Sequence, residues 1–182
     1  MFMSAMAAFT ALTSQLVLLG YLTCSDGEQI PVYGEPGIWA NSTFEWPTHE
    51  ELDLMTRTLW GEARSQSDEE IASIANVIIN RVISPRWPST FEGVIKDPGQ
   101  FLVWSDGDPN RPLMVRLRTE DISYQRVFAI ALDVVSQRYL GYDDPTNGMT
   151  HYHHGQDAPY WAANAIAAVQ IGDARFYRLR SP

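Results

Sequence analysis

Hydrophobic residues recur every three or four positions from residue 52 onward, which is the spacing of one face of a helix. Thr48 and Glu51 precede this run with the spacing of a capping box, in which each side chain bonds the backbone N–H of the other residue. The pattern therefore predicts a helix that starts after Thr48. Its apolar stripe consists of Leu52, Met55, Leu59 and Ala63.

A second capping box, Ser67 to Glu70, opens another predicted helix. The apolar stripe of this helix is wider, so we expect the helix to be buried on most sides. Pro85 disfavours the helical conformation in the residue before it, so the helix should end near Ser84. Its apolar positions are Ile71, Ile74, Ala75, Ile78 and Val82, widened by Val77 and Ile79.

The rest of the chain has shorter patterns. Ser89 and Glu92 are spaced to cap a short helical turn, and the segment DPGQFLVWSDGDPNRP has the Pro, Gly and Asp content of a loop. A third long helix is predicted from Thr119 to about Gly141. The expected fold class is α+β, predominantly helical, with a small late antiparallel sheet. Its strands are indicated by the β-branched and aromatic residues of MTHYHH, AAVQIG and RFYRL.

The first 25 residues contain no charged side chain, and the composition changes abruptly at Asp26. Read as a helix, they place apolar residues at alternating spacings of three and four. A signal peptide needs a basic start, which is absent, and a membrane-spanning helix needs about 20 mostly apolar residues, whereas polar residues interrupt this segment. We therefore expect residues 1–25 to dock against a partner protein, with export or membrane contact of residues 1–24 as the alternatives.

Residues 26–47 contain three prolines and three glycines and are interpreted as an extended arm, which leaves residues 48–182 as the domain with the candidate chemistry. Thirteen Lys and Arg against 22 Asp and Glu give a net charge of -9. No nucleic-acid partner is expected, because such a partner is held mainly by neutralising its phosphates. Cys24 is the only cysteine, which excludes an intramolecular disulfide and a cysteine-based metal site.

Glu62 occupies an unusual position in the first predicted helix. At about 100° per residue it lies within ~20° of Met55, on the edge of the apolar stripe. A buried carboxylate loses hydration in its charged form, so its pKa rises and it becomes a proton donor near neutral pH. The alternative is an ordinary helix-edge residue that is paired with an arginine. Gly61 indicates the helix end, or another segment that approaches the backbone closely.

Four segments resemble, in order and spacing, the cell wall hydrolase family of the spore cortex-lytic enzyme SleB. They are LWGEARSQSDEEIASIANVIINRV, SPRWPSTFEGVIKDPGQF, HYHHGQDAPYWA and IGDARFY. The resemblance covers about residues 54–177, and GEAR followed by NRV, PGQF and IGxxxFY is a specific combination. It implies a lysozyme-like catalytic domain over residues 48–182 that cleaves the glycan strand of peptidoglycan. Glu62, in the GEAR motif, would be the catalytic acid.

The chain departs from the usual family pattern at three places. Ser65 stands where the family commonly has Gly, and Leu102 follows PGQF where a Ser is usual. Asp173 and Ala174 replace the familiar Asn-His after IG, so any role carried by that His is absent here. None of these departures affects the acid.

The reaction that the resemblance implies needs only one acid. Most glycosidases use two carboxylates, but no second acidic residue has a placement comparable to that of Glu62. Asp106 and Asp108 lie in a loop that could border the cleft, and residues 68–70 have the favourable position of acids at a helix start. In a lytic transglycosylase, Glu62 would protonate the oxygen between N-acetylmuramic acid and N-acetylglucosamine. It would then act as base while the muramic 6-hydroxyl closes on C1. No cofactor is expected.

Other residues are candidates for substrate contacts. Amides can bond sugar hydroxyls, and aromatic rings can stack on sugar faces, although packing under loops is the alternative for the aromatic residues. Asn80 and Arg81 lie in the buried helix and could line the cleft or orient Glu62, and a structural network explains them equally well. The candidate substrate-binding residues are Asn80, Gln100, Phe101, Tyr152, Tyr160 and Trp161.

Three histidines offer a competing chemistry. His151, His153 and His154, with Asp157 or Glu62, would be the ligands of a zinc-dependent N-acetylmuramoyl-L-alanine amidase, which hydrolyses the link between glycan and peptide. A strand, however, sends His151 and His153 to one face and His154 to the other, whereas catalytic zinc needs three convergent ligands. We therefore expect no metal site.

The uncharged N-terminus and the arm indicate that the domain is attached to something larger. We expect a virion-associated enzyme, for example in a phage tail, whose residues 1–47 bind a protein partner while the domain acts on the host cell wall in the periplasm. The alternatives are an exported or membrane-anchored bacterial protein and a catalytically silent structural component of a virion.

Overall fold

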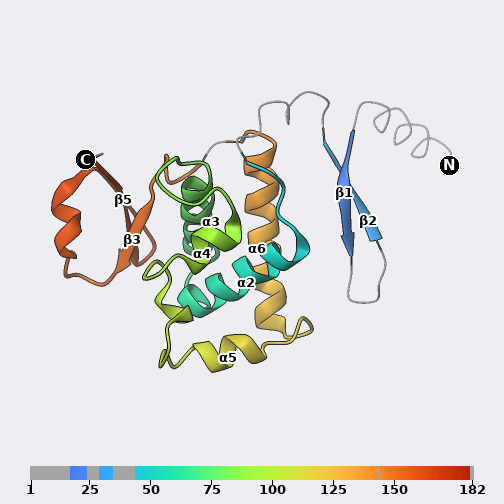
Figure 1. Cartoon of the computed structure of the whole chain (residues 1–182), viewed down its shortest axis with the longest axis horizontal. Helices are drawn as coiled ribbons and strands as arrows, with labels where there is room; N and C mark the ends of the chain where they lie inside the picture. Colours follow the sequence, from blue (N-terminus) through green and yellow to red (C-terminus); the bar gives the residue numbers. More distant parts are fainter. Residues whose placement is uncertain (1–16, 24–28, 35–43, 143, 181–182) are drawn as a thin grey trace, which may run out of the picture. The chain divides into compact units, whose positions relative to one another are not determined.

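The computed structural model describes residues 17–23, 29–34, 44–142 and 144–180, which belong to two separate compact units, residues 1–42 and 43–182 (Figure 1). In the first unit, strand β1 (Val17–Thr23) pairs antiparallel with strand β2 (Gln29–Gly34). In the described residues no helix is long and apolar enough to cross a membrane.

The helical interpretation of residues 1–25 is wrong over Val17–Thr23, which form a strand. The run VLLGYLT contains a β-branched residue and an aromatic residue, which favour a strand, and a glycine, which disfavours a helix. It pairs with QIPVYG, part of the predicted arm. Residues 1–16 and 24–28 lie outside the described residues, and the docking role of residues 1–25 stays a prediction.

The second unit begins with two helices whose predicted starts are confirmed. Helix α2 (His49–Ala63) has a complete capping box, in which the Glu51 N–H donates to Thr48 Oγ1 at 3.2 Å and the Thr48 N–H donates to Glu51 Oε2 at 3.1 Å. Helix α3 (Asp68–Val82) is capped by Ser67, whose hydroxyl accepts the Glu70 N–H at 3.2 Å. The Glu70 side chain does not complete this second box but turns into the protein, as described below.

The next elements differ partly from the prediction. Helix α4 (Phe91–Lys96) is capped by Thr90, whose hydroxyl accepts the Gly93 N–H at 3.0 Å, and not by Ser89. The predicted loop contains a short 3-10 helix, η2 (Leu102–Trp104), and is followed by an unpredicted helix, α5 (Arg111–Arg116). The third long helix, α6 (Ile122–Tyr139), is confirmed, and it packs against both α2 and α3.

The chain ends in the predicted small antiparallel sheet, which lies beside the helices (Figure 1). Its strands are β3 (His151–His154), β4 (Ala165–Ile171) and β5 (Ala174–Leu179), in the order β3-β5-β4. A 3-10 helix, η3 (Tyr160–Asn164), connects β3 to β4. The sheet and the preceding helices confirm the expected α+β class.

The hydrophobic core surrounds helix α3, as its wide apolar stripe predicts. The side chains of Ile71, Ile74 and Ile78 are fully buried. Helix α3 is covered by α2, α4 and α6 and also contacts strand β4. The inner face of the sheet adds Phe176 and Ile171 to the same core. The consequence is that the helical layer and the sheet share one core.

Gly61 marks the predicted close approach to the backbone of helix α2. A Cβ atom at this position would lie 2.2 Å from Val103 Cγ2 and 3.3 Å from Met114 Sδ. The residue next to Gly61 in the chain is the candidate acid, so the absence of a side chain lets η2 pack directly beside Glu62.

Candidate active site

Glu62 lies in the last turn of helix α2 and is partly buried. Its two carboxylate oxygens have different partners. Oε1 accepts the backbone N–H of Val103 at 3.4 Å, and Oε2 accepts the hydroxyl of Tyr152 at 3.0 Å. The carboxylate is therefore held between η2 and strand β3, two segments that are far apart in the sequence.

The electrostatic environment suits a proton donor. Loss of hydration on burial raises the pKa of Glu62 above its usual value, and this effect outweighs the hydrogen bonds from Tyr152 and Val103, which lower it. The charge of His154 also lowers the pKa of Glu62, and the charge of Asp108 raises it. A carboxyl group in such surroundings retains its proton to higher pH than an exposed one.

Tyr152 is the predicted site residue that directly contacts Glu62. Its ring stacks on Phe176 of strand β5, with 5.8 Å between ring centres. Burial and the neighbouring Glu62 raise the pKa of Tyr152 well above its usual value. The phenol therefore stays protonated at neutral pH and remains a hydrogen-bond donor to the carboxylate.

A second acid, Glu70, lies close to this pair. Its side chain is only 1% exposed, and it accepts a hydrogen bond of 2.7 Å from His154 Nε2 and one of 2.8 Å from the Asp173 N–H. The sequence predicts for Glu70 only the ordinary position of an acid at a helix start. A missed signal was its helical spacing from Ile74 and Val77, four and seven residues later, which places it on the buried face.

Arg81 brings a buried cation near the candidate acid. Its side chain is 4% exposed, and its Nε donates to the Thr150 carbonyl at 2.8 Å. Its NH1 has no hydrogen-bond partner in the described part of the chain. Burial lowers the pKa of Arg81, and the charges of Asp97 and Glu62 act in the opposite direction. The guanidinium also lies over the Phe101 ring, 5.3 Å from its centre.

Asn80 lies beside Arg81, but its hydrogen bonds point to another part of the domain. Its Nδ2 donates to Asp144, Thr146 and the Met149 carbonyl, and its Oδ1 accepts from Arg138. This network fixes the chain that leads into strand β3. The structure thus gives Asn80 a supporting position, and its contact with substrate stays a prediction.

The remaining predicted contact residues lie in the loop before η2 and on η3. Phe101 is buried beneath Arg81, and Gln100 precedes it in the loop before η2. Tyr160 is 92% exposed on η3. Trp161, also on η3, packs against His151 at 5.3 Å and Tyr177 at 5.4 Å between ring centres. The roles of Gln100, Phe101, Tyr160 and Trp161 in sugar binding stay predictions.

The histidines diverge as the alternation of a strand requires. His151 and His153 both pack against Trp161, whereas His154 reaches Glu70 on the opposite face. Across residues 17–23, 29–34, 44–142 and 144–180, no three His, Cys, Asp or Glu side chains are grouped so that they could hold a metal ion. This geometry disfavours the zinc amidase alternative.

Comparison with known proteins identifies the class to which this fold and site belong. The family model described as Cell Wall Hydrolase matches residues 65–177, more than half of the chain, and the chain belongs to this family. The match begins three residues after Glu62. The candidate acid thus lies outside the matched segment.

Among individual proteins, the chain is similar to spore cortex-lytic enzymes. It is 28% identical to that of Oceanobacillus iheyensis over 122 residues, which are 67% of this chain and 39% of that protein. It is 37% identical to that of Bacillus subtilis over 60 residues, which are 33% of this chain and 20% of that protein. The chain therefore spans less than half of the length of these relatives.

Two solved structures have the same fold. The catalytic domain of the Bacillus cereus SleB protein matches with a TM-score of 0.59 and 22% identity, over 76% of this chain and 98% of that domain. The catalytic domain of the germination-specific lytic transglycosylase SleB from Bacillus anthracis matches with a TM-score of 0.56 and 23% identity, over 72% and 96%. The expected SleB-like, lysozyme-like architecture is confirmed.

Proposed function

We propose that residues 48–182 cleave the glycan strand of peptidoglycan as a lytic transglycosylase, with Glu62 as general acid and then as base. The observation that carries this assignment is the partly buried carboxylate of Glu62. Burial raises its pKa, and hydrogen bonds from Tyr152 and Val103 hold it from two sides. Membership of the cell wall hydrolase family supports the substrate, and similarity to the lytic transglycosylase SleB of Bacillus anthracis supports the reaction.

In the first step, protonated Glu62 donates its proton to the glycosidic oxygen between N-acetylmuramic acid and N-acetylglucosamine. The C1–O bond of the muramic residue breaks, and positive charge develops at C1. In the second step, the carboxylate of Glu62 accepts the proton of the muramic 6-hydroxyl as this oxygen bonds C1. The product is a 1,6-anhydro sugar, no water is consumed, and Glu62 is protonated again.

The placement of the other acids supports a one-acid reaction. Glu70 is almost completely buried and already accepts two hydrogen bonds, so it has no access to a sugar. Asp106 is ion-paired with Arg111 at the surface. Asp108 is the remaining candidate for a second carboxylate, because its charge acts on Glu62, and its Oδ1 accepts the Asn110 N–H at 2.8 Å.

Mass spectrometry of peptidoglycan fragments tests this assignment. Wild-type protein, Glu62→Gln and Asp108→Asn are each incubated with purified peptidoglycan. Anhydromuramic ends that disappear in Glu62→Gln and persist in Asp108→Asn are expected. Reducing ends that are lost in both variants would instead identify a hydrolase with Asp108 as its second carboxylate. Free stem peptides that disappear on chelation would identify the amidase.

We also propose that residues 1–47 attach the enzyme to a protein partner in a virion, so that the domain meets the host cell wall. The separate compact unit of residues 1–42, in which β1 and β2 pair with each other, supports an independent attachment role. Sedimentation of the full chain with virus particles, lost on deletion of residues 1–42, is the expected result. A soluble monomer with a processed N-terminus would support export instead, and recovery with membranes would support anchoring.

A further inference from the structure

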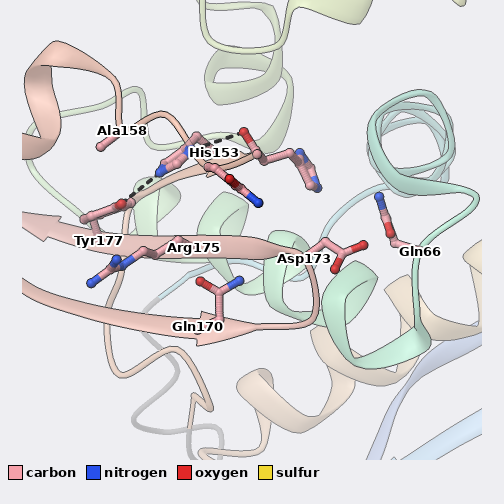
Figure 2. Close-up of a pocket in the computed structure, with 10 residues that line it drawn as sticks. Gln66, His153, Ala158, Gln170, Asp173, Arg175 and Tyr177 are labelled. Atoms are coloured by element: carbon pink, nitrogen blue, oxygen red, sulfur yellow. Dashed lines mark hydrogen bonds between the residues drawn. The ribbon is translucent and has the colours of Figure 1, made fainter.

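A cavity of about 670 Å³ lies at the sheet (Figure 2). Cross-strand neighbours share one face of a sheet, and His153, Arg175 and Gln170 are such neighbours on β3, β5 and β4. Tyr152 pairs with Phe176 on the opposite, inner face. We call this space the outer-face cavity, lined mainly by Gln66, His153, Gln156, Asp173, Arg175 and Tyr177.

The cavity offers unpaired groups of both charges. Arg175 is its only Lys or Arg, and none of the ion pairs among the described residues includes Arg175 or Asp173. Both residues are exposed, and both line the cavity. The amides of Gln66 and Gln156 add neutral donors and acceptors. A ligand that carries a carboxylate, an ammonium group and amide bonds would match all of these groups.

The ring of Tyr177, which lines the cavity, is not free to stack on a sugar. His153 stacks on the Tyr177 ring at 5.5 Å between centres, and Trp161 meets the ring edge-on at 5.4 Å. The Arg175 guanidinium lies 5.8 Å from the centre of the same ring. Tyr177 itself is 4% exposed. Sugar recognition usually needs an open aromatic face, so the chemistry of this cavity favours a peptide over a second stretch of glycan.

Strand β3 connects the cavity to the candidate acid. His154 lines the cavity and bonds Glu70, and Tyr152, two residues earlier on β3, holds Glu62. Two residues of strand cover about 6.6 Å. An extended peptide advances about 3.3–3.6 Å per residue. A chain of three or more residues attached to a sugar at Glu62 is therefore long enough to pass the end of β3 and enter the cavity.

We propose that the outer-face cavity binds the peptide stem that is attached to the muramic residues of peptidoglycan. Arg175 binds a carboxylate of the stem, Asp173 binds an ammonium group, and Gln66 and Gln156 bond its amides. This assignment rests on the proposed cleavage of the glycan strand, since it names a further part of the same substrate. It makes Arg175 a specificity residue for stem-bearing strands.

Binding is tested without catalysis. The full-length Glu62→Gln protein is titrated with the soluble tripeptide L-alanyl-γ-D-glutamyl-meso-diaminopimelate, and backbone NMR shifts are followed. Shifts at residues 170–177 are expected, and adding Arg175→Gln should weaken binding about tenfold or more, as for loss of a hydrogen bond to a charged group. The matched control is Arg180→Gln, an exposed arginine after β5 that does not line the cavity. Absence of shifts at the cavity, or equal binding by both variants, would overturn the assignment.

Measurements of cleavage on two substrates distinguish a failure of stem binding from a failure of glycan cleavage. Wild-type protein and Arg175→Gln are compared on intact peptidoglycan and on glycan strands whose stems have been removed. Arg175→Gln should lower kcat/KM about tenfold on stem-bearing strands and leave it unchanged on bare strands. Equal losses on both substrates would overturn the inference. If the tripeptide binds but the wild-type protein cleaves neither substrate, the cavity assignment stands and glycan cleavage is refuted.

Discussion

The hydroxyl of Tyr152 donates a 3.0 Å hydrogen bond to Oε2 of Glu62, and so connects strand β3 to the end of helix α2 across 90 residues of chain. The bond favours the ionised carboxylate, whereas burial favours the protonated one. Both forms are needed in turn by a group that first gives and then takes a proton. The site thus contains opposing influences on one carboxyl group.

Replacing Tyr152 by Phe removes this donor and keeps the ring that stacks on Phe176. The pKa of Glu62 should rise further, because a bond that lowers it is lost. Glu62 then stays protonated to higher pH, so the alkaline limb of the kcat/KM profile should move to higher pH. We expect kcat to fall about tenfold, with little change in KM. A raised KM with an unmoved pH profile would instead give Tyr152 a role in substrate binding only.

Gly61→Ala should displace η2 from helix α2. The new Cβ would lie 2.2 Å from Val103 Cγ2, and Val103 supplies the N–H that bonds Glu62. We expect a stability loss of about 1–3 kcal/mol by urea denaturation, the usual range for overpacking, together with lower activity. The double variant Gly61→Ala/Val103→Ala removes the closest contact and should recover part of both losses. Additive losses in the double variant would contradict this account.

Gly172→Ala tests the buried position of Glu70. Its φ of 59° lies in the left-handed region, and an added Cβ would lie 2.1 Å from Glu70 Oε2. The left-handed conformation alone costs about 1–2 kcal/mol for a non-glycine residue. Gly107→Ala is a matched control, because Gly107 has φ 87° and open space around it. Gly172→Ala should therefore lower the free energy of unfolding more than Gly107→Ala does, as measured by parallel denaturation curves. Equal losses would mean that the Glu70 side chain can move aside without loss of stability.

Glu62→Gln should change stability in a pH-dependent way. Burial raises the pKa of Glu62 in the folded protein, so its contribution to stability is fully present below the unfolded-state pKa and is lost as pH rises through the folded-state pKa. Gln has no such dependence. The variant should therefore gain stability relative to the wild type as pH increases, as measured by urea denaturation at pH 4 and pH 8. A stability difference between the two proteins that stays the same at pH 4 and pH 8 would contradict this expectation.

Local signals were sufficient to predict the helical part of the site. Helix caps involve residues only three positions apart, and the structure has the predicted helix starts at Thr48 and at Ser67. Gly61 indicated a close approach because a glycine inside a helix needs a reason. The alternation of a strand separated His154 from His151 and His153.

Contacts between distant segments could not be predicted in this way. In the sequence Glu70 is an ordinary acid of a first helical turn, and its partner His154 comes 84 residues later. The short helix α5 has too few residues to show a period. The alternating spacing of apolar residues favours a helix for residues 1–25, whereas pairing with the distant segment β2 makes residues 17–23 a strand.

The central strand of the late sheet is the last one in the sequence. Strand β3, which carries Tyr152, pairs with β5 and with no other strand in the described residues. During synthesis, Glu62 emerges from the ribosome more than 100 residues before Ala174–Leu179. The hydrogen bond that holds the carboxylate therefore forms only when translation has passed these residues, and a shorter nascent chain lacks an assembled site.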